Sequence, residues 1–316
     1  MKNIFNLLLV SALAMLMQSC SKDLVVTDEP NDPEKFEEVQ LRLTGEVAYM
    51  TPETRLDASG FEDGDAFGVY TTTGKMGPNK KLAPENAKYI YKNGTIEAID
   101  DGNVIYWEDN KSMKIYAYYP HDITDNIKDE KAYAFAIKLD QSTPGNYYKS
   151  DFLRAESDAV AKTSNPVDLD FYHLMSKVSV TITHDDSITD TDFNSATKEL
   201  TIEGVANSGK INLIARTIEE PTSFGKTLKT FADGNTFSAI LYPQNKEGVK
   251  FRLRLGNDYY SSTMSINYES GKEYKYTFKV TKNEGALSLK STKIETWGDG
   301  GTTATNMTKE NSTSSN

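Results

Sequence analysis

The sequence predicts an all-β protein, and three observations carry that prediction. Apolar and polar residues alternate along many short segments, which is the period of a half-buried strand. Turn-forming residues such as Asn-Gly separate these segments at short intervals, as in a sandwich or barrel. The chain also holds 18 tyrosines and much threonine, and both residue types favour strands. No segment shows helical periodicity beyond a turn or two.

The first residues are typical of an export signal. Lys2 precedes an apolar run over residues 4–17, which is too short to span a bilayer stably and is followed by polar sequence. We therefore predict a signal peptide over residues 1–19, and the run length disfavours the alternatives of a membrane helix or a core helix. Cys20 follows directly. As the single cysteine it cannot form an internal disulfide, and its position is typical of the lipidated cysteine of a bacterial lipoprotein.

The rest of the chain is expected to form a tether, two domains and a tail. Residues 20–35 are polar, contain two prolines and lack the apolar content to fold, so they are predicted to be a tether. The remaining length suits two domains of ordinary size. A polar, proline-ended segment at 161–166 marks the expected boundary between β-sandwiches at 36–165 and 166–300. Residues 301–316 are predicted to be a polar, disordered tail.

Alternation places strands in both halves. In the first half the expected strands cover residues 39–43, 88–92, 95–99, 104–107, 115–119 and 133–139. Asn93-Gly94 joins two of them and is the strongest short hairpin signal, because both turn positions need a positive φ. In the second half the clearest strands cover residues 178–182, 251–255 and 274–280.

Charge and motif content exclude several function classes. The net charge is -11, and removal of residues 1–19 makes the chain more acidic because that segment holds one lysine and no acidic residue. Acidic chains repel phosphate backbones, so we expect no nucleic-acid partner. The chain has no Gly-x-Ser-x-Gly elbow, phosphate-binding glycine loop or plausible cysteine nucleophile. We predict no enzymatic activity and no cofactor; a hydrolase built on a carboxylate pair is a remaining alternative.

The three histidines are the remaining candidates for metal binding. His121 is expected in a solvated loop and His173 in the core with a satisfied hydrogen bond. His184 precedes Asp185 and Asp186, a composition that suits a metal. Metal ligands, however, generally converge from several elements rather than from one turn. No metal site is predicted.

Several segments, in their order and spacing, resemble the fimbrillins and fimbrillin-like lipoproteins of Bacteroidales. The resemblance covers most of the chain after the tether. It rests on TR (54–55), FEDGDAFGVY (61–70), IYW (105–107), YAYYP (116–120), SDFLRA (150–155), VDLDFYHLMSKV (167–178), GKEYKY (271–276) and IETWGDG (294–300). It implies two Greek-key, transthyretin-like β-sandwiches in tandem. It also implies a lipid-anchored protein on the outer membrane, at the cell surface, in a fimbrium.

The function that this resemblance implies is a structural or adhesive fimbrial component that assembles by strand exchange. In this family's assembly, an arginine-specific protease removes the N-terminal strand, and the C-terminal strand of another subunit fills the groove. By position, the removable strand covers residues 38–50 and Arg55 is the cleavage point, although an ordinary surface arginine is an equal alternative. The candidate groove-filling side chains are Val39, Leu41, Leu43 and Val47.

Two further features of the sequence bear on this interpretation. The tail at 301–316 departs from a donor strand, because only Ala304 and Met307 could fill pockets, so a tip, anchor or accessory role is at least as well supported as a stalk role. Ser187 lies in a short motif, Asp-Ser-Ile, that matches O-glycosylation sites in these bacteria.

The expected partners are other fimbrial subunits, outer-membrane lipid through acylated Cys20, and ligands on host or bacterial surfaces. The alternative function is a surface glycan-binding lipoprotein, because exposed tyrosines on sandwich loops can stack on sugars.

Overall fold

The computed structural model describes residues 38–48, 60–78, 81–82, 86–121, 132–215, 217–219, 221–282, 286–297 and 305–306. Nearly all elements in these ranges are strands, so the all-β prediction is confirmed. Among these residues no helix has the length and apolar character needed to cross a membrane. Cys20 and Arg55 lie outside the described residues.

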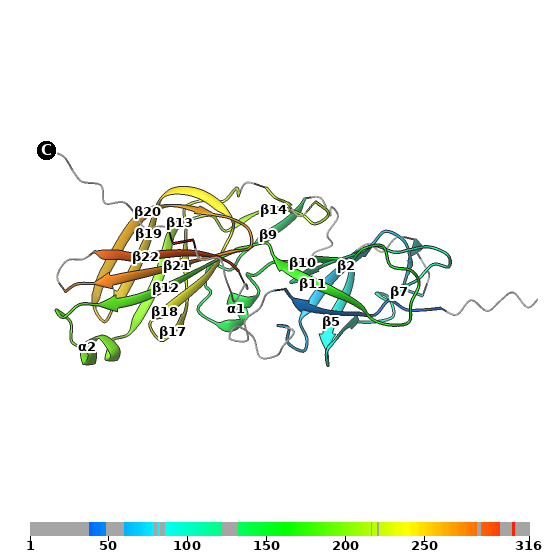
Figure 1. The fold of residues 1–316 in the computed structure, drawn as a ribbon, viewed down its shortest axis with the longest axis horizontal. Helices are drawn as coiled ribbons and strands as arrows, with labels where there is room; N and C mark the ends of the chain where they lie inside the picture. The colour runs from blue at the N-terminus through cyan, green and yellow to red at the C-terminus, as the bar shows by residue number, and fades with distance from the viewer. Residues whose placement is uncertain are drawn as a thin grey trace, which may run out of the picture. The chain divides into compact units, whose positions relative to one another are not determined.

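The strands of the N-terminal half pair with one another in a closed order, so this half is a β-barrel. Neighbouring strands pair around it, and several are labelled in Figure 1. In order around the barrel, they are β1 (Leu43–Val47), β11 (Val167–His173), β10 (Leu153–Glu156), β8 (Ile115–Tyr119), β2 (Ala66–Thr71), β5 (Ala87–Lys92) and β6 (Thr95–Ala98).

The β5–β6 hairpin shows how local chemistry sets one part of this barrel. Lys92 pairs with Thr95, which leaves Asn93 and Gly94 as a two-residue turn. Their φ values are 50° and 86°, as a primed turn requires and as Asn-Gly tolerates best. The hairpin predicted from the sequence is therefore confirmed.

The C-terminal half is a two-layer sandwich. Figure 1 shows β12, β21 and β22 side by side in one layer. Phe251 packs on Tyr276 and Phe278 from the facing sheet, with ring centroids 5.6 and 5.4 Å apart. The first sheet holds β17 (Phe231–Asp233), β18 (Thr236–Leu241), β12 (Ser176–His184), β21 (Lys272–Val280), β22 (Leu287–Thr296) and β23 (Thr305–Asn306). The second holds β16 (Lys226–Lys229), β13 (Lys198–Val205), β19 (Gln244–Leu255) and β20 (Asp258–Tyr268).

Two small sheets and two short helices complete the described fold. The helices are α1 (Pro144–Tyr148) and α2 (Asp190–Ser195), which begin after Thr143 and Thr189 because those hydroxyls cap the first turn. One small sheet joins β15 (Thr217–Ile218), β14 (Ser208–Asn212) and β9 (Tyr133–Ala136). The other joins β4 (Lys81–Leu82), β3 (Lys75–Met76) and β7 (Ile105–Tyr106).

Strand pairing crosses the domain boundary predicted at residues 165 and 166. β11 begins at Val167, yet it belongs to the barrel between β1 and β10. β9 comes before the predicted boundary, yet it pairs with β14 through Tyr133–Ile211 and Phe135–Gly209. The change from barrel to sandwich falls between His173 and Ser176, where β11 ends and β12 begins. A division into two separately folding domains stays a prediction.

Part of the predicted polar tail pairs with the sandwich. Thr305 and Asn306 lie opposite Ile294 and Lys293 of β22, as the short strand β23.

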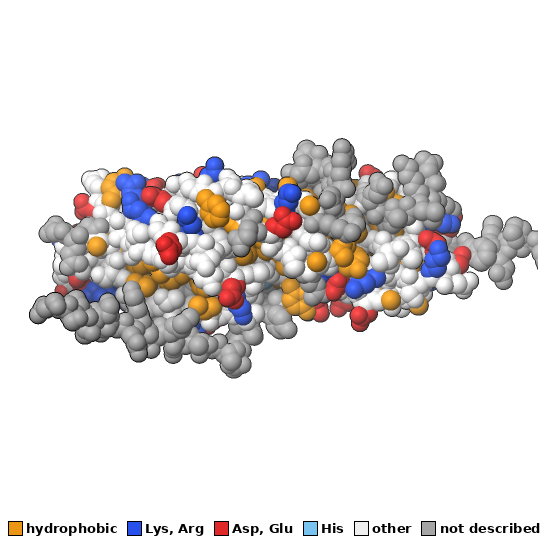
Figure 2. Space-filling model, turned by 90° about the horizontal axis from the view of Figure 1, so that it is seen from above, with side chains coloured by type: hydrophobic (Ala, Val, Ile, Leu, Met, Phe, Trp, Pro, Cys, Tyr) orange, Lys and Arg blue, Asp and Glu red, His pale blue; other side chains and the backbone are white. Residues whose placement is uncertain are grey.

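On the face shown in Figure 2, acidic and basic side chains are interspersed among polar and apolar ones.

Candidate assembly site

The strand predicted to be removable is the first strand of the barrel. β1 runs parallel to β11, in a register from Leu43 opposite Val167 to Val47 opposite Phe171. One residue later the Ala48 N–H donates to the Phe171 carbonyl at 2.8 Å. One edge of β1 is therefore hydrogen-bonded along its length.

The opposite edge of β1 is held far less. In the described residues, its pairing with β6 consists of one residue pair, Leu43 with Ile96. Arg42 adds an ion pair to Glu97 at 3.4 Å, but both side chains are about half exposed. An exposed pair of this kind contributes about 0–1 kcal/mol. We call this junction of β1 with β6 and β11 the seam of the barrel.

The residues just before β1 run beside β7. Gln40 lies opposite Tyr106 in an antiparallel bridge. The Leu41 N–H donates to the Ile105 carbonyl at 2.7 Å, and the Trp107 N–H donates to the Val39 carbonyl at 2.9 Å. Residues 39–41 are thus hydrogen-bonded to β7 and to Trp107, which follows it.

All four predicted groove-filling side chains meet the barrel core. Leu41, Leu43 and Val47 are buried there, and Val39 packs against the core while partly buried. Burial of a valine or leucine side chain stabilises a fold by about 1.5–3 kcal/mol. β1 therefore supplies a substantial part of the apolar interior of the barrel.

Aromatic rings make up much of the core into which the buried side chains of β1 point. Phe61 packs against Phe67 and Phe171, with centroids 4.9 and 5.1 Å apart. Tyr89 is fully buried in the same core, and its hydroxyl accepts a hydrogen bond from the Ile105 N–H at 3.4 Å. Burial raises the pKa of Tyr89 well above its ordinary value. The surroundings of β1 are thus apolar and suited to alternating apolar side chains.

The sequence reasoning missed one inward position of this strand. Gly45 lies between Leu43 and Val47 on the buried face, where the Phe171 ring covers it. The alternation that predicts Leu43 and Val47 on the buried face also places residue 45 there. Glycine has no side chain to fill a groove, so the apolar pattern does not include it.

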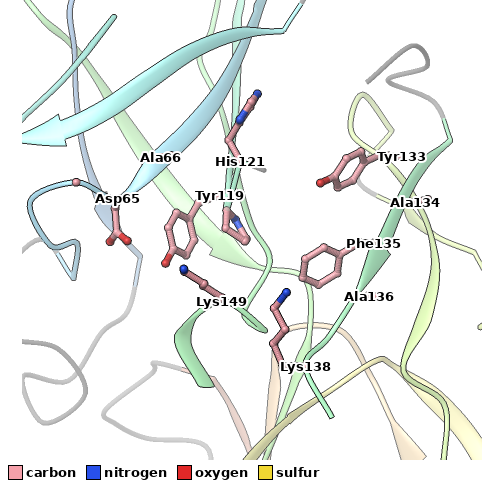
Figure 3. A pocket seen from close by; sticks show the side chains of 12 residues that line it. Asp65, Ala66, Tyr119, His121, Tyr133, Ala134, Phe135, Ala136, Lys138 and Lys149 are labelled. Carbon is pink, nitrogen blue, oxygen red and sulfur yellow. The ribbon is translucent and has the colours of Figure 1, made fainter. Parts of the chain in front are cut away.

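A pocket of about 490 Å³ opens beside the end of β8 and the strand β9. In Figure 3 the side chains of Tyr119, Phe135, Lys138 and Lys149 point toward it. Asp65, which directly precedes β2, lies on the other side of the pocket. Pockets of this size hold small ligands in many proteins.

His121 lines this pocket and is half-buried, in contrast to the solvated loop predicted for it. Its ring stacks on Tyr118, and its Nε2 lies 3.2 Å from the Asn86 amide nitrogen. Tertiary packing of the β8 end, which local sequence does not reveal, accounts for this difference.

His173 occupies the predicted core position. Its Nδ1 lies 3.0 Å from the Asp151 carboxylate, and its ring stacks on Trp297 with centroids 3.7 Å apart. His184 Nε2 lies 3.2 Å from the Asp190 carboxylate. In the described part of the chain, no three His, Cys, Asp or Glu side chains converge as metal ligands.

The predicted O-glycosylation site, Ser187, lies in the sandwich, after β12. Ser187 is exposed, and its hydroxyl donates to the Asp185 carboxylate and accepts from the Lys282 N–H at 2.8 Å. Its glycosylation stays a prediction. Lipidation of Cys20 and cleavage after Arg55 fall on residues that the structure does not describe.

The chain is similar in sequence to one protein family and in fold to several solved structures. A family model described as fimbrillin-like matches residues 54–297. Two solved structures provisionally assigned to cell adhesion share the fold. The Bacteroides uniformis protein is 22% identical, with a TM-score of 0.63 over 83% of this chain and 98% of that one. The Bacteroides ovatus protein is 20% identical, with a TM-score of 0.66 over 82% and 98%.

At these identities the two structures show the fold alone. No curated protein matches the chain. The family model, by contrast, matches more than half of the sequence. The chain therefore belongs to the fimbrillin-like family.

Proposed function

We propose that this chain is a structural or adhesive component of cell-surface fimbriae and that it assembles by strand exchange. An arginine-specific protease cuts after Arg55, the segment that carries β1 leaves, and a strand of another subunit enters the seam. Membership of the fimbrillin-like family supports the fimbrial role and implies a location at the cell surface. The chain has no catalytic role in this proposal.

The single observation that carries the proposal is how β1 closes the barrel. It is paired along β11 but meets β6 only at Leu43. Its departure would leave β11 with an unpaired edge and expose the slot that Leu41, Leu43 and Val47 fill. An unpaired edge beside an apolar slot is the form of site to which a further strand adds.

The chain order makes this departure feasible. Arg55 lies between β1 and β2, so a cut there severs the covalent link from β1 to the other barrel strands. The central strand β8 offers a contrast, because it pairs with β10 on one edge and with β2 on the other at several residues each. β1 is the strand that the seam can release.

Anchoring is a separate part of the proposal. Acylation of Cys20 would attach the chain to the outer membrane through the tether, because acyl chains bury many methylenes in the bilayer. The polar composition of residues 301–316 leaves a tip, anchor or accessory position at least as well supported as a stalk position. A Cys20→Ser variant that still partitions with membranes after export would contradict the lipid anchor.

Arginine-specific proteolysis followed by native mass measurement tests the exchange. We expect a cut after Arg55, release of the β1 segment and slow formation of complexes with other fimbrial subunits or with synthetic strands. The matched control is Arg55→Gln, which should stay intact and monomeric under the same treatment. An exported, folded chain that the protease never cuts at Arg55 would contradict the proposal. So would a cut chain that retains its β1 segment against an excess of competitor strand.

The pocket beside β9 favours a second candidate function, the binding of surface glycans. Its lining includes Lys138, Lys149 and Asp65, whose charged groups can form hydrogen bonds with sugar hydroxyls. The strand tyrosines do not form such a site, because Tyr89, Tyr91, Tyr118, Tyr274 and Tyr276 are buried. A glycan array with purified protein separates the candidates: tight sugar binding without assembly would favour the second.

A further inference from the structure

The seam contains a feature that determines which strands fit it. Along β1 the buried positions are Leu43, Gly45 and Val47, preceded by Leu41. A Cβ atom placed on Gly45 would lie 2.8 Å from the Cε2 atom of Phe171 and 2.9 Å from the Leu169 carbonyl oxygen. Real Cβ atoms essentially never approach other atoms this closely, so any side chain at this position forces a shift.

The requirement is one of space and not of backbone conformation. Gly45 lies within a regular strand, which any residue can adopt. What excludes a side chain is the Phe171 ring together with the Leu169 carbonyl oxygen, which occupy the place where the second inward side chain of β1 would otherwise lie. Phe171 belongs to β11, the strand that pairs with β1 along its length.

Neither obstacle can retreat easily. The Phe171 ring packs against Phe61 and Phe67 with centroids 5.1 and 5.4 Å away, and all three are at most 1% exposed. Close packing of this kind resists displacement, and overpacked cores lose stability. Leu169 lies within β11, so its carbonyl oxygen is part of a strand paired with β1 and with β10.

We infer that the seam accepts only strands with a specific pattern of inward residues. The pattern is apolar, apolar, glycine, apolar at alternate positions, as in Leu41, Leu43, Gly45 and Val47, in a strand that runs parallel to β11. This inference deepens the proposed function and rests on it. It identifies the partner as a strand of another subunit that carries glycine at the third inward position.

Residues 301–316 of this chain do not carry the pattern. Their apolar residues, Ala304 and Met307, are three positions apart, so an extended strand would place them on opposite faces. No apolar residue precedes Ala304 at alternate spacing within this segment. The same segment from a second copy is therefore a poor occupant, and a different subunit is the expected one.

Peptide capture by the cleaved protein tests the pattern. The protein is cut after Arg55, its β1 segment is removed, and labelled peptides of residues 38–48 are titrated against it. We expect the native peptide to bind and the Gly45→Ala peptide to bind at least about tenfold more weakly, as expected for overpacking. The Gly45→Val peptide should not bind. The control peptide Glu46→Gln, changed on the exposed face, should bind like the native one.

A second experiment, on the uncut protein, tests the steric requirement at Gly45 independently of strand exchange. Gly45→Ala should lower the melting temperature by several degrees, and this loss should shrink in a Phe171→Leu background, where the ring no longer blocks the Cβ. If no peptide binds but the loss in melting temperature is smaller in the Phe171→Leu background, strand exchange is contradicted and the steric requirement at Gly45 is supported. Equal binding of the native and Gly45→Ala peptides would overturn the inference, and so would an equal loss in both backgrounds. If Gly45→Ala does not fold, the peptide arm decides.

Discussion

The barrel and the sandwich of this protein differ in how their strands are held. In the sandwich, β12 pairs along most of its length with β18 on one side and β21 on the other. In the barrel, β1 has a comparable ladder on the β11 side and one residue pair on the β6 side. Both regions bury their inward side chains well, so the difference lies in hydrogen bonding at one seam and not in the quality of the core. A strand can therefore contribute fully buried side chains to a core and still be hydrogen-bonded mainly along one edge.

Large-to-small changes in the two cores should show the largest effects on stability. Leu43→Ala in the barrel and Leu253→Ala in the sandwich both remove a fully buried side chain, and each should lower the free energy of unfolding by about 2–5 kcal/mol. Hydrogen exchange should show that each variant loses amide protection in its own region. Leu43→Ala should reduce amide protection in β1, β6 and β11 and leave β12 and β21 protected, while Leu253→Ala should do the reverse. Equal loss in both regions after Leu43→Ala would show that barrel and sandwich unfold as one unit.

Arg154 joins the barrel strand β10 to the segment that follows β14, and its replacement should have an intermediate effect. Its guanidinium group is 2% exposed, donates to the carbonyls of Leu213 and Ile214 and pairs with Glu156 at 2.7 Å. Arg154→Met keeps much of the volume but leaves these acceptors unsatisfied, so it should cost about 1–3 kcal/mol in chemical denaturation.

The matched control for Arg154 is an exposed arginine of the sandwich. Arg252 lies over the exposed Tyr259 ring, 4.2 Å from its centroid, and Arg252→Met should cost about 0.5–1 kcal/mol. Equal losses in the free energy of unfolding for the two variants would show that the buried hydrogen bonds of Arg154 to the segment after β14 stabilise the fold no more than an exposed contact does.

The smallest expected effect lies in the sandwich at acid pH. Hydrogen bonds from Ser187 and Thr281 lower the pKa of Asp185 to about 2. A carboxylate with a depressed pKa stabilises the folded state above its ordinary pKa of about 3.9, and that contribution is lost as pH falls through the lowered pKa. The melting temperature of the native protein should exceed that of Asp185→Asn by a constant margin above pH 5, and the margin should vanish toward pH 2. The control is the exposed neighbour Asp186→Asn, and a margin that grows on acidification would contradict the assignment.

Local periodicity predicted much of the fold because it reports which face of a strand is buried. Leu41, Leu43 and Val47 were expected on one face, and all three are buried. Asn93-Gly94 was expected to close a hairpin, and its backbone conformation confirms it. These features depend on residues close together in the sequence, where pattern and turn chemistry act directly.

Alternation says nothing about which strand lies beside which. The barrel closes through pairing of β1 with β11, whose residues are more than a hundred positions apart, and no local pattern encodes that partner. The same holds for β9, which pairs with β14 across the predicted domain boundary. The boundary was placed by composition, and composition does not follow hydrogen bonding between distant strands.

Sequence patterns alone predict a β-protein that resembles fimbrillins and whose residues 39–47 turn one apolar face inward. That this face closes a barrel beside β11, and that the Phe171 ring lies over Gly45, follows from the fold. A strand's own side chains set its amphipathic pattern, whereas the space beside each of them is set by residues that the fold brings from elsewhere in the chain.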